Sequence, residues 1–252
     1  ILPLSKDKKY AVIGQMAKKP RHQGAGSSLV NPIKLDNAFD TMFSRGINVT
    51  YAPGYALTKK EAKNKTQDAY INEAVAAAKN ADIALVFVGL TDVFESEGFD
   101  RSHLRIPPEH VALIEAVKNV NSNVVLVLAG GAVIEMPWED NAKAILHSFL
   151  GGEAGGSAVV DLLFGDVNPS GKLAETYPYK LEDTPCYDYF PGNTTTVEYR
   201  EGIYIGYRYY DTAKKDVRYP FGYGLSYTTF EYSDISVSND DIKDTDTITV
   251  KF

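Results

Sequence analysis

The run Ile83-Ala-Leu-Val-Phe-Val-Gly-Leu90 is the feature that most constrains the fold. An apolar run without polar alternation is typical of a strand buried on both faces, as in parallel sheets covered by helices. The longest apolar runs are about eight residues, whereas a membrane helix needs roughly 20. The chain is therefore expected to build an α/β fold around this strand, with no membrane partner.

Strand-like and helix-like segments alternate along the first two thirds of the chain. Further strands are predicted at 9–14, 47–51, 123–129 and 142–149, and helices at 34–45, 67–81, 107–120 and 153–164. This alternation predicts an α/β fold with a mostly parallel open sheet and helices on both faces, a three-layer sandwich. Right-handed crossovers place the carboxyl ends of all strands at one edge, where such sheets bind their ligands.

The pattern changes after Tyr177. Residues 178–227 are rich in aromatic residues, proline and glycine, which predicts a long ordered arm rather than disorder. The alternation at Phe230, Tyr232, Ile235 and Val237 then predicts the first strands of a β-sandwich. We therefore expect an α/β domain over 1–230 and the start of a second domain over 231–252.

Composition excludes several classes of protein. A net charge of −7, with no basic cluster longer than three residues, argues against nucleic acid as a partner. The four histidines lack metal-ligand spacing, so no metal is expected. The single Cys186 cannot form an internal disulfide, which fits either a cytoplasmic protein or a secreted protein without disulfides. Of the two, we favour the cytoplasm of a bacterium. Because the chain begins at Ile1 rather than Met, we expect a fragment or a processed product.

Two glycine-rich segments superficially match nucleotide-binding motifs. Gly24-Ala-Gly-Ser-Ser-Leu29 lacks the third glycine of a dinucleotide fingerprint and lies about ten residues beyond its strand. The segment 165–172 has five residues between its glycines, where a P-loop has four, and Leu173 follows its lysine. Neither segment predicts nucleotide binding, and no cofactor is expected. The first is interpreted either as a tight turn or as a loop leaning over a site at the same sheet edge.

The loop after the buried strand carries the strongest chemical signal. Four acids lie within nine residues, next to one arginine: Asp92, Glu95, Glu97, Asp100 and Arg101. Its ordinary interpretation is a solvated acidic loop. Two features favour a site instead: the loop lies at the ligand edge, and Gly98 lets the backbone approach a ligand closely. Crowded carboxylates also raise the pKa of one member, as a general acid needs at neutral pH. We single out Glu97 as that acid.

Several segments resemble the C-terminal α/β domain of glycoside hydrolase family 3 β-glucosidases. The resemblance extends from residue 1 to about 232 and rests on long motifs in the same order. They include Ala11-Val-Ile-Gly14, Pro20-Arg-His-Gln-Gly-Ala-Gly-Ser-Ser28, Glu95-Ser-Glu-Gly-Phe-Asp-Arg101, Leu163-Phe-Gly-Asp-Val-Asn-Pro-Ser-Gly-Lys-Leu173, Tyr199-Arg-Glu-Gly202 and Pro220-Phe-Gly-Tyr-Gly-Leu-Ser-Tyr227. The resemblance implies that the terminal strands begin a fibronectin III-like domain.

The resemblance also implies an active site shared between two domains. A (β/α)8 domain, absent from this chain, would supply an Asp nucleophile and most sugar contacts. This chain would supply the acid/base Glu97, with Glu95 as the runner-up. Arg21, Gln23 and Phe99 are expected to contact the substrate or the partner domain. The implied reaction is retaining hydrolysis of a β-glucoside or oligosaccharide, with the two carboxyls roughly 5–5.5 Å apart. The isolated chain is predicted to be inactive.

Some alternatives stay open. Ser233-Asp234 superficially matches the family's nucleophile element, but it lies in the tail and is discounted. A non-catalytic carbohydrate-binding or docking module would also explain the aromatic-rich arm. The sugar, the linkage, the domain order and a homo-oligomer are not determined by the sequence.

Overall fold

The computed structural model describes all 252 residues and contains a five-stranded parallel sheet. The strands are β1 (Lys9–Ile13), β2 (Asn48–Ala52), β3 (Ile83–Gly89), β4 (Val124–Ala129) and β5 (Ala144–Phe149). Their order is β2-β1-β3-β4-β5, and every neighbouring pair is parallel. The predicted α/β fold is confirmed. The order reverses between β1 and β3, and at such a reversal open α/β sheets form a ligand crevice.

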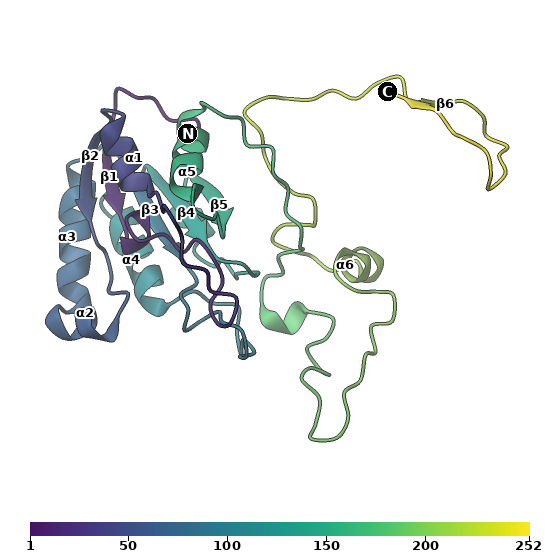
Figure 1. Cartoon of the computed structure of the whole chain (residues 1–252), viewed down its shortest axis with the longest axis horizontal. Coiled ribbons are helices and arrows are strands. Elements are labelled where there is room, and N and C mark those ends of the chain that lie inside the picture. Colours follow the sequence, from purple (N-terminus) through teal and green to yellow (C-terminus); the bar gives the residue numbers. More distant parts are fainter.

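Helices cover both faces of the sheet (Figure 1). Helices α1 (Ala38–Ser44) and α5 (Gly155–Phe164) pack against each other, and α3 (Gln67–Lys79) packs against α4 (Pro108–Lys118). The chain also forms α2 (Lys59–Asn64), α6 (Tyr207–Ala213) and three short 3-10 turns, η1 (Gln15–Ala17), η2 (Glu139–Asn141) and η3 (Leu181–Asp183). Because all neighbouring strands are parallel, their carboxyl ends lie together at one edge of the sheet.

Helix α2 was not predicted because it has no apolar face. It buries none of its residues, so hydrophobic periodicity cannot reveal it. The signal that does mark it is a capping box, in which Thr58 caps the amide of Glu61 and the Glu61 side chain accepts from the Thr58 amide. Local capping, rather than burial, therefore defines this helix.

The core surrounds the neighbouring strands β3 and β4. Every residue of β3 and β4 is buried, as the unbroken apolar runs predict. The buried Tyr55 joins the sheet to the turn after β1: its hydroxyl donates to the Phe87 carbonyl at 2.9 Å and accepts from the Met16 amide at 3.1 Å. Gly14 has φ +111°, and a Cβ there would lie 2.1 Å from the Phe87 carbonyl oxygen. Only glycine therefore fits at position 14, where the chain leaves β1 and passes close to the backbone of β3.

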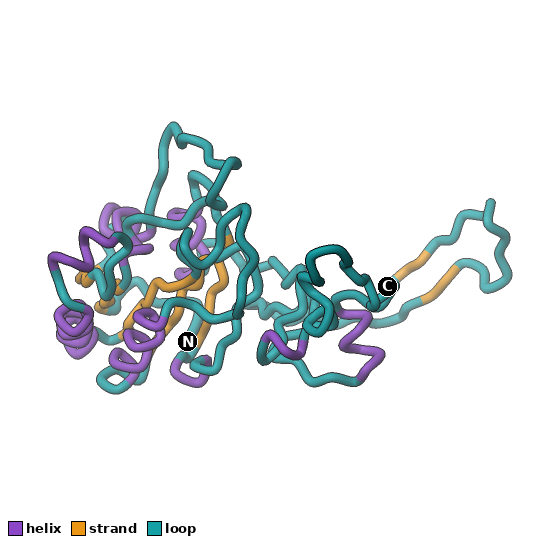
Figure 2. Tube along the Cα trace, turned by 90° about the horizontal axis from the view of Figure 1, so that it is seen from below, coloured by secondary structure: helices purple, strands orange, loops and turns teal.

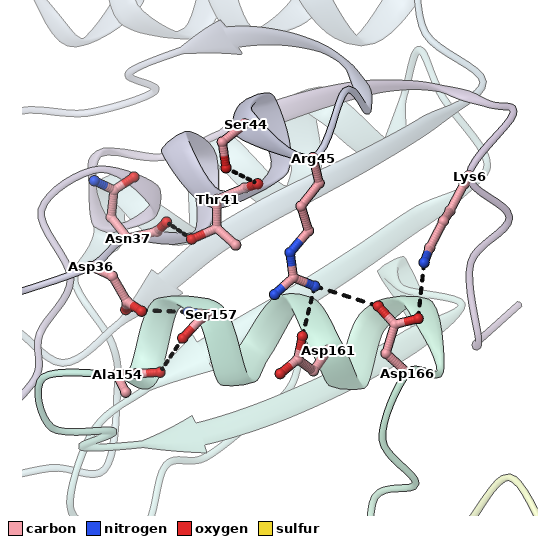
Figure 3. A network of polar contacts seen from close by, with 10 residues as sticks. All are labelled: Lys6, Asp36, Asn37, Thr41, Ser44, Arg45, Ala154, Ser157, Asp161 and Asp166. Carbon is pink, nitrogen blue, oxygen red and sulfur yellow. Dashed lines mark hydrogen bonds and ion pairs between the residues drawn. The ribbon is translucent and has the colours of Figure 1, made fainter.

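A polar network fixes α1 on α5 (Figure 3). The Asp36 carboxylate accepts from the Gly156 and Ser157 amides at 2.9 and 3.2 Å, at the start of α5. Arg45 bridges Asp161 and Asp166 at 2.6 and 3.4 Å. The long segment between β1 and α1 is therefore anchored at both ends, by the sheet and by α5.

The arm extends away from the sheet (Figure 1). It is attached by backbone bonds between Tyr177 and Tyr219 (2.8 Å) and between Leu173 and Tyr223 (2.8 Å). Many of its large apolar side chains are exposed. Beyond the arm, the strands β6 (Ser236–Val237) and β7 (Val250–Lys251) pair as a two-stranded antiparallel ribbon (Figure 2). That ribbon is shorter than the predicted strands, and its assignment to a fibronectin III-like domain stays a prediction. None of the helices combines the length and the apolar composition that a membrane span requires.

Candidate active site

Two loops meet at the carboxyl edge of the sheet. We call them the first-strand loop (residues 14–37) and the acidic loop (residues 90–107); they follow the neighbouring strands β1 and β3. Arg21 reaches across to the acidic loop, where its guanidinium contacts Asp92 Oδ1 and the Glu95 carbonyl oxygen, each at 2.8 Å. The Glu97 amide donates to the Ala25 carbonyl at 3.0 Å. The two loops therefore form one connected unit.

Glu97 presents its carboxyl at the surface of this unit. The Ser27 amide donates to Glu97 Oε2 at 2.8 Å, and the Ser27 hydroxyl donates to the same oxygen. These donors, the hydroxyl first, lower the pKa of Glu97 below its usual value. The expectation that crowded acids raise the pKa of Glu97 is therefore wrong for this chain. The groups bonded to its carboxylate are donors, while Asp92 and Glu95 bond to Arg21 instead.

Glu95 turns inward instead. Its side chain is 18% exposed, and Oε2 lies 3.3 Å from Arg21 Nη2. The same oxygen accepts from the Gly131 amide at 3.0 Å, which ties the acidic loop to the loop after β4. Glu95 and Glu97 are two residues apart but face different surroundings, one inside the loop cluster and one at its surface.

Behind the acidic loop lies a second group of charged side chains. The Arg101 guanidinium donates to the Val133 carbonyl at 2.6 Å, and burial lowers its pKa although Glu95 opposes this effect. Burial raises the pKa of Glu175. No group of three or more His, Cys, Asp or Glu side chains is arranged to hold a metal ion. The Arg101 bond ties the acidic loop to the segment around Val133.

The other predicted site residues fall into two kinds. Arg21 has a side chain that is 5% exposed, and its contacts lie within the chain. It lines a small cavity of about 40 Å³ beneath the loops. Gln23 makes a reciprocal pair with the backbone of Val30, at 2.8 and 3.0 Å, and so closes its own loop. Phe99, by contrast, is 79% exposed and free to contact a ligand or another domain. The structure therefore brings Arg21 and Glu97 into one unit and leaves Phe99 at its rim.

Sequence reasoning missed Ser27, which contacts Glu97 directly. It gave two interpretations of the glycine-rich segment around Gly24, a tight turn or a loop leaning over a site at this edge, and neither selected the serine. The usable signal was a serine next to two closely spaced glycines, because such segments can aim backbone and hydroxyl donors at an anion.

Comparisons with known proteins agree with this architecture. The family described as "Glycosyl hydrolase family 3 C-terminal domain" matches residues 1–227. A thermostable β-glucosidase B from Acetivibrio thermocellus is 50% identical over 99% of this chain, which covers 33% of that protein. An exo-α-(1→6)-L-arabinopyranosidase from Bifidobacterium longum is 48% identical over 94% of this chain, which covers 31% of that protein. The chain thus spans about a third of the length of these curated relatives.

Solved structures show the same fold. The crystal structure of a β-glucosidase from Bifidobacterium adolescentis superposes with a TM-score of 0.90 at 46% identity, covering 95% of this chain and 35% of that one. A β-glucosidase 3B from Thermotoga neapolitana, in complex with glycerol, gives a TM-score of 0.79 at 32% identity over 95% of this chain and 37% of that one. The sheet, the two loops and the family match together show that the chain belongs to the glycosyl hydrolase family 3 C-terminal domain family.

Proposed function

We propose that this chain supplies the general acid/base, Glu97, to the active site of a retaining β-glucosidase. The observation that carries the proposal is that Glu97 combines a fixed backbone with an exposed carboxyl. Its amide is held by Ala25 at 3.0 Å, at the sheet edge where open α/β folds bind ligands. Glu95, the other candidate, is 18% exposed and already bonded to Arg21 and Gly131. The geometry therefore favours Glu97 for exchange of a proton with a substrate.

The second catalytic carboxylate belongs, in this proposal, to a (β/α)8 domain in the longer protein. The chain covers only 33% of a relative named as a β-glucosidase, so most of that enzyme lies outside the shared region. The arm supports such a partner, because large apolar side chains such as Tyr199, 87% exposed, need covering. The superposition at a TM-score of 0.90 covers 95% of this chain, so nearly all of it shares its fold with part of a longer enzyme. We therefore expect the arm to pack on the missing domain.

The proposed reaction has two steps. Protonated Glu97 first donates to the glycosidic oxygen while the nucleophile attacks the anomeric carbon, which leaves a glycosyl-enzyme. The Glu97 carboxylate then takes a proton from the water that releases the sugar. In this chain alone the pKa of Glu97 is lowered, which suits the second step. The nucleophile carboxylate, roughly 5–5.5 Å away, and burial under substrate would raise it for the first step.

The test is Glu97→Ala in the full-length protein. We expect a loss of roughly 10²–10⁴-fold on glucosides with poor leaving groups, because these need protonation of the leaving oxygen. Azide should partly restore turnover of substrates with good leaving groups by replacing the water that needs a base. Asp100→Asn, in the same loop, is the matched control and should retain activity. Wild-type turnover of poor substrates by Glu97→Ala would remove Glu97 from the mechanism.

The sugar is not assigned by this domain. Two relatives of nearly equal identity, 50% and 48%, are named as a β-glucosidase and as an α-L-arabinopyranosidase. The residues shared with both therefore do not select the sugar ring or its linkage. We place that selection in the part of the protein outside this chain.

A second candidate, a carbohydrate-binding or docking module, is favoured by one feature of the arm. A groove of about 490 Å³ is lined by four tyrosines among charged residues: Tyr187, Tyr189, Tyr204 and Tyr209. Tyrosine faces with polar tips suit sugar rings and protein surfaces alike. Calorimetry of the 252-residue chain with glucose and cellobiose decides between the roles. Binding heat would support a sugar-binding arm, and its absence would leave the catalytic proposal alone.

A further inference from the structure

Three backbone and side-chain groups of one short segment hold residue 97. The Ala25 carbonyl accepts from the Glu97 amide at 3.0 Å, and the Ser27 amide donates to Glu97 Oε2 at 2.8 Å. The Ser27 hydroxyl donates to the same oxygen. Both donors use Oε2, so the direction of the carboxylate is set by a residue of the other loop.

Gly26 makes this close approach sterically feasible. Its φ is +109°, and a Cβ there would lie 2.6 Å from the Glu97 Cβ and 3.0 Å from Oε2. Gly24, two residues earlier, would bring its Cβ only within 3.7 Å of the Ser28 hydroxyl. The backbone at Gly26, directly before Ser27, therefore leaves no room for a side chain next to Glu97. The backbone at Gly24 does have such room.

From this geometry we propose that Ser27 is a positioning residue for the acid/base carboxyl. It directs the carboxyl through Oε2, and Oε1 is the oxygen that we assign to proton exchange with the substrate. The inference rests on the proposed function of Glu97. Neither the composition of the acidic loop nor the names of the relatives assigns a role to Ser27.

Ser27 also affects the balance between the two steps of the reaction. A donor to the charged form stabilises the carboxylate, which is the base of the second step. In the assembled enzyme, where the nucleophile and the substrate raise the pKa, Ser27 limits that rise. Without its hydroxyl, Glu97 stays protonated to higher pH and its carboxyl is less well directed at the leaving oxygen.

The experiment compares Ser27→Ala, Ser27→Thr and Glu97→Ala in the full-length protein. The readouts are the pH dependence of kcat/KM and its ratio between an alkyl glucoside and a dinitrophenyl glucoside. In Ser27→Ala we expect the basic limb to move to higher pH and the alkyl substrate to lose more than the activated one. Ser27→Thr keeps a hydroxyl and should restore both. Because Ser27 is exposed, its truncation removes no core contact.

The two proposals fail in distinguishable ways. If Glu97→Ala loses activity while Ser27→Ala keeps the wild-type pH profile and substrate ratio, the role of Ser27 is overturned and that of Glu97 stands. If Ser27→Ala loses kcat/KM equally on both substrates and the basic limb of its pH profile does not move, the positioning role is also overturned, and Ser27 only maintains the loop. If Glu97→Ala is fully active, the proposed function fails, and the role of Ser27 fails with it.

Discussion

Replacing Arg21 with methionine tests whether this side chain anchors the acidic loop. Its side chain is 5% exposed, and its guanidinium donates to the Glu95 carbonyl at 2.8 Å; a charge-assisted bond of this kind contributes about 1.5–3 kcal/mol. The ion pair with Asp92 adds at most ~1 kcal/mol, because Asp92 is 75% exposed. Methionine preserves the packing of the aliphatic stem. We therefore expect Arg21→Met to lower the free energy of unfolding by about 2–4 kcal/mol.

The assay is denaturant unfolding of the 252-residue chain, with Asp92→Asn as the matched control. Asp92→Asn removes only the exposed partner and should cost no more than ~1 kcal/mol. In a thermal scan each kcal/mol corresponds to about 2–4 °C for a chain of this size. An Arg21→Met variant as stable as wild type, with a raised KM in the full-length enzyme, would refute the anchoring role. That result would instead favour the role expected from the sequence, in which Arg21 contacts the substrate.

Three further predictions concern the core and the loop contact. Tyr55→Phe leaves two buried backbone groups unpaired and should cost about 2–4 kcal/mol in denaturant unfolding, whereas a loss below ~0.5 kcal/mol would contradict that role. Burial lowers the pKa of His110 to about 3, so the unfolded chain binds more protons below about pH 6.5. Stability should therefore fall as pH drops from 6.5 towards 3, and His110→Leu should lose less between pH 7.5 and 5 than wild type does. Gly26→Ala should reduce activity of the full-length protein by displacing the Glu97 carboxyl, while Gly24→Ala should not; equal activities would show that the loop adapts.

Burial made the sheet predictable. The apolar run at 83–90 predicted a strand covered on both faces, and its alternation with helical segments predicted a mostly parallel sheet; both are confirmed. The ends of the helices were predicted less accurately. The helix predicted over 34–45 begins at Ala38, because the Asn37 side chain caps the amide of Asp40 and Asp36 is recruited by α5. Such ends depend on tertiary partners that hydrophobic periodicity does not report.

The same limit explains the error about the charge of Glu97. Counting acids along the loop predicts mutual repulsion, but the charge state depends on which groups the fold brings near. Ser27 lies 70 positions away in the chain, and the reversal of strand order between β1 and β3 makes it a neighbour. The position of Glu97 at the ligand edge could be predicted from topology. Its hydrogen-bond donors could not.

The amide of residue 97, bonded to Ala25, has a consequence for how this domain can change over generations. That bond uses only main-chain atoms, so any amino acid other than proline at this position can preserve it. A lineage could exchange the glutamate for a residue of different reactivity without unfolding the loop. Such a descendant would keep the loop conformation although it had lost the reactive carboxyl.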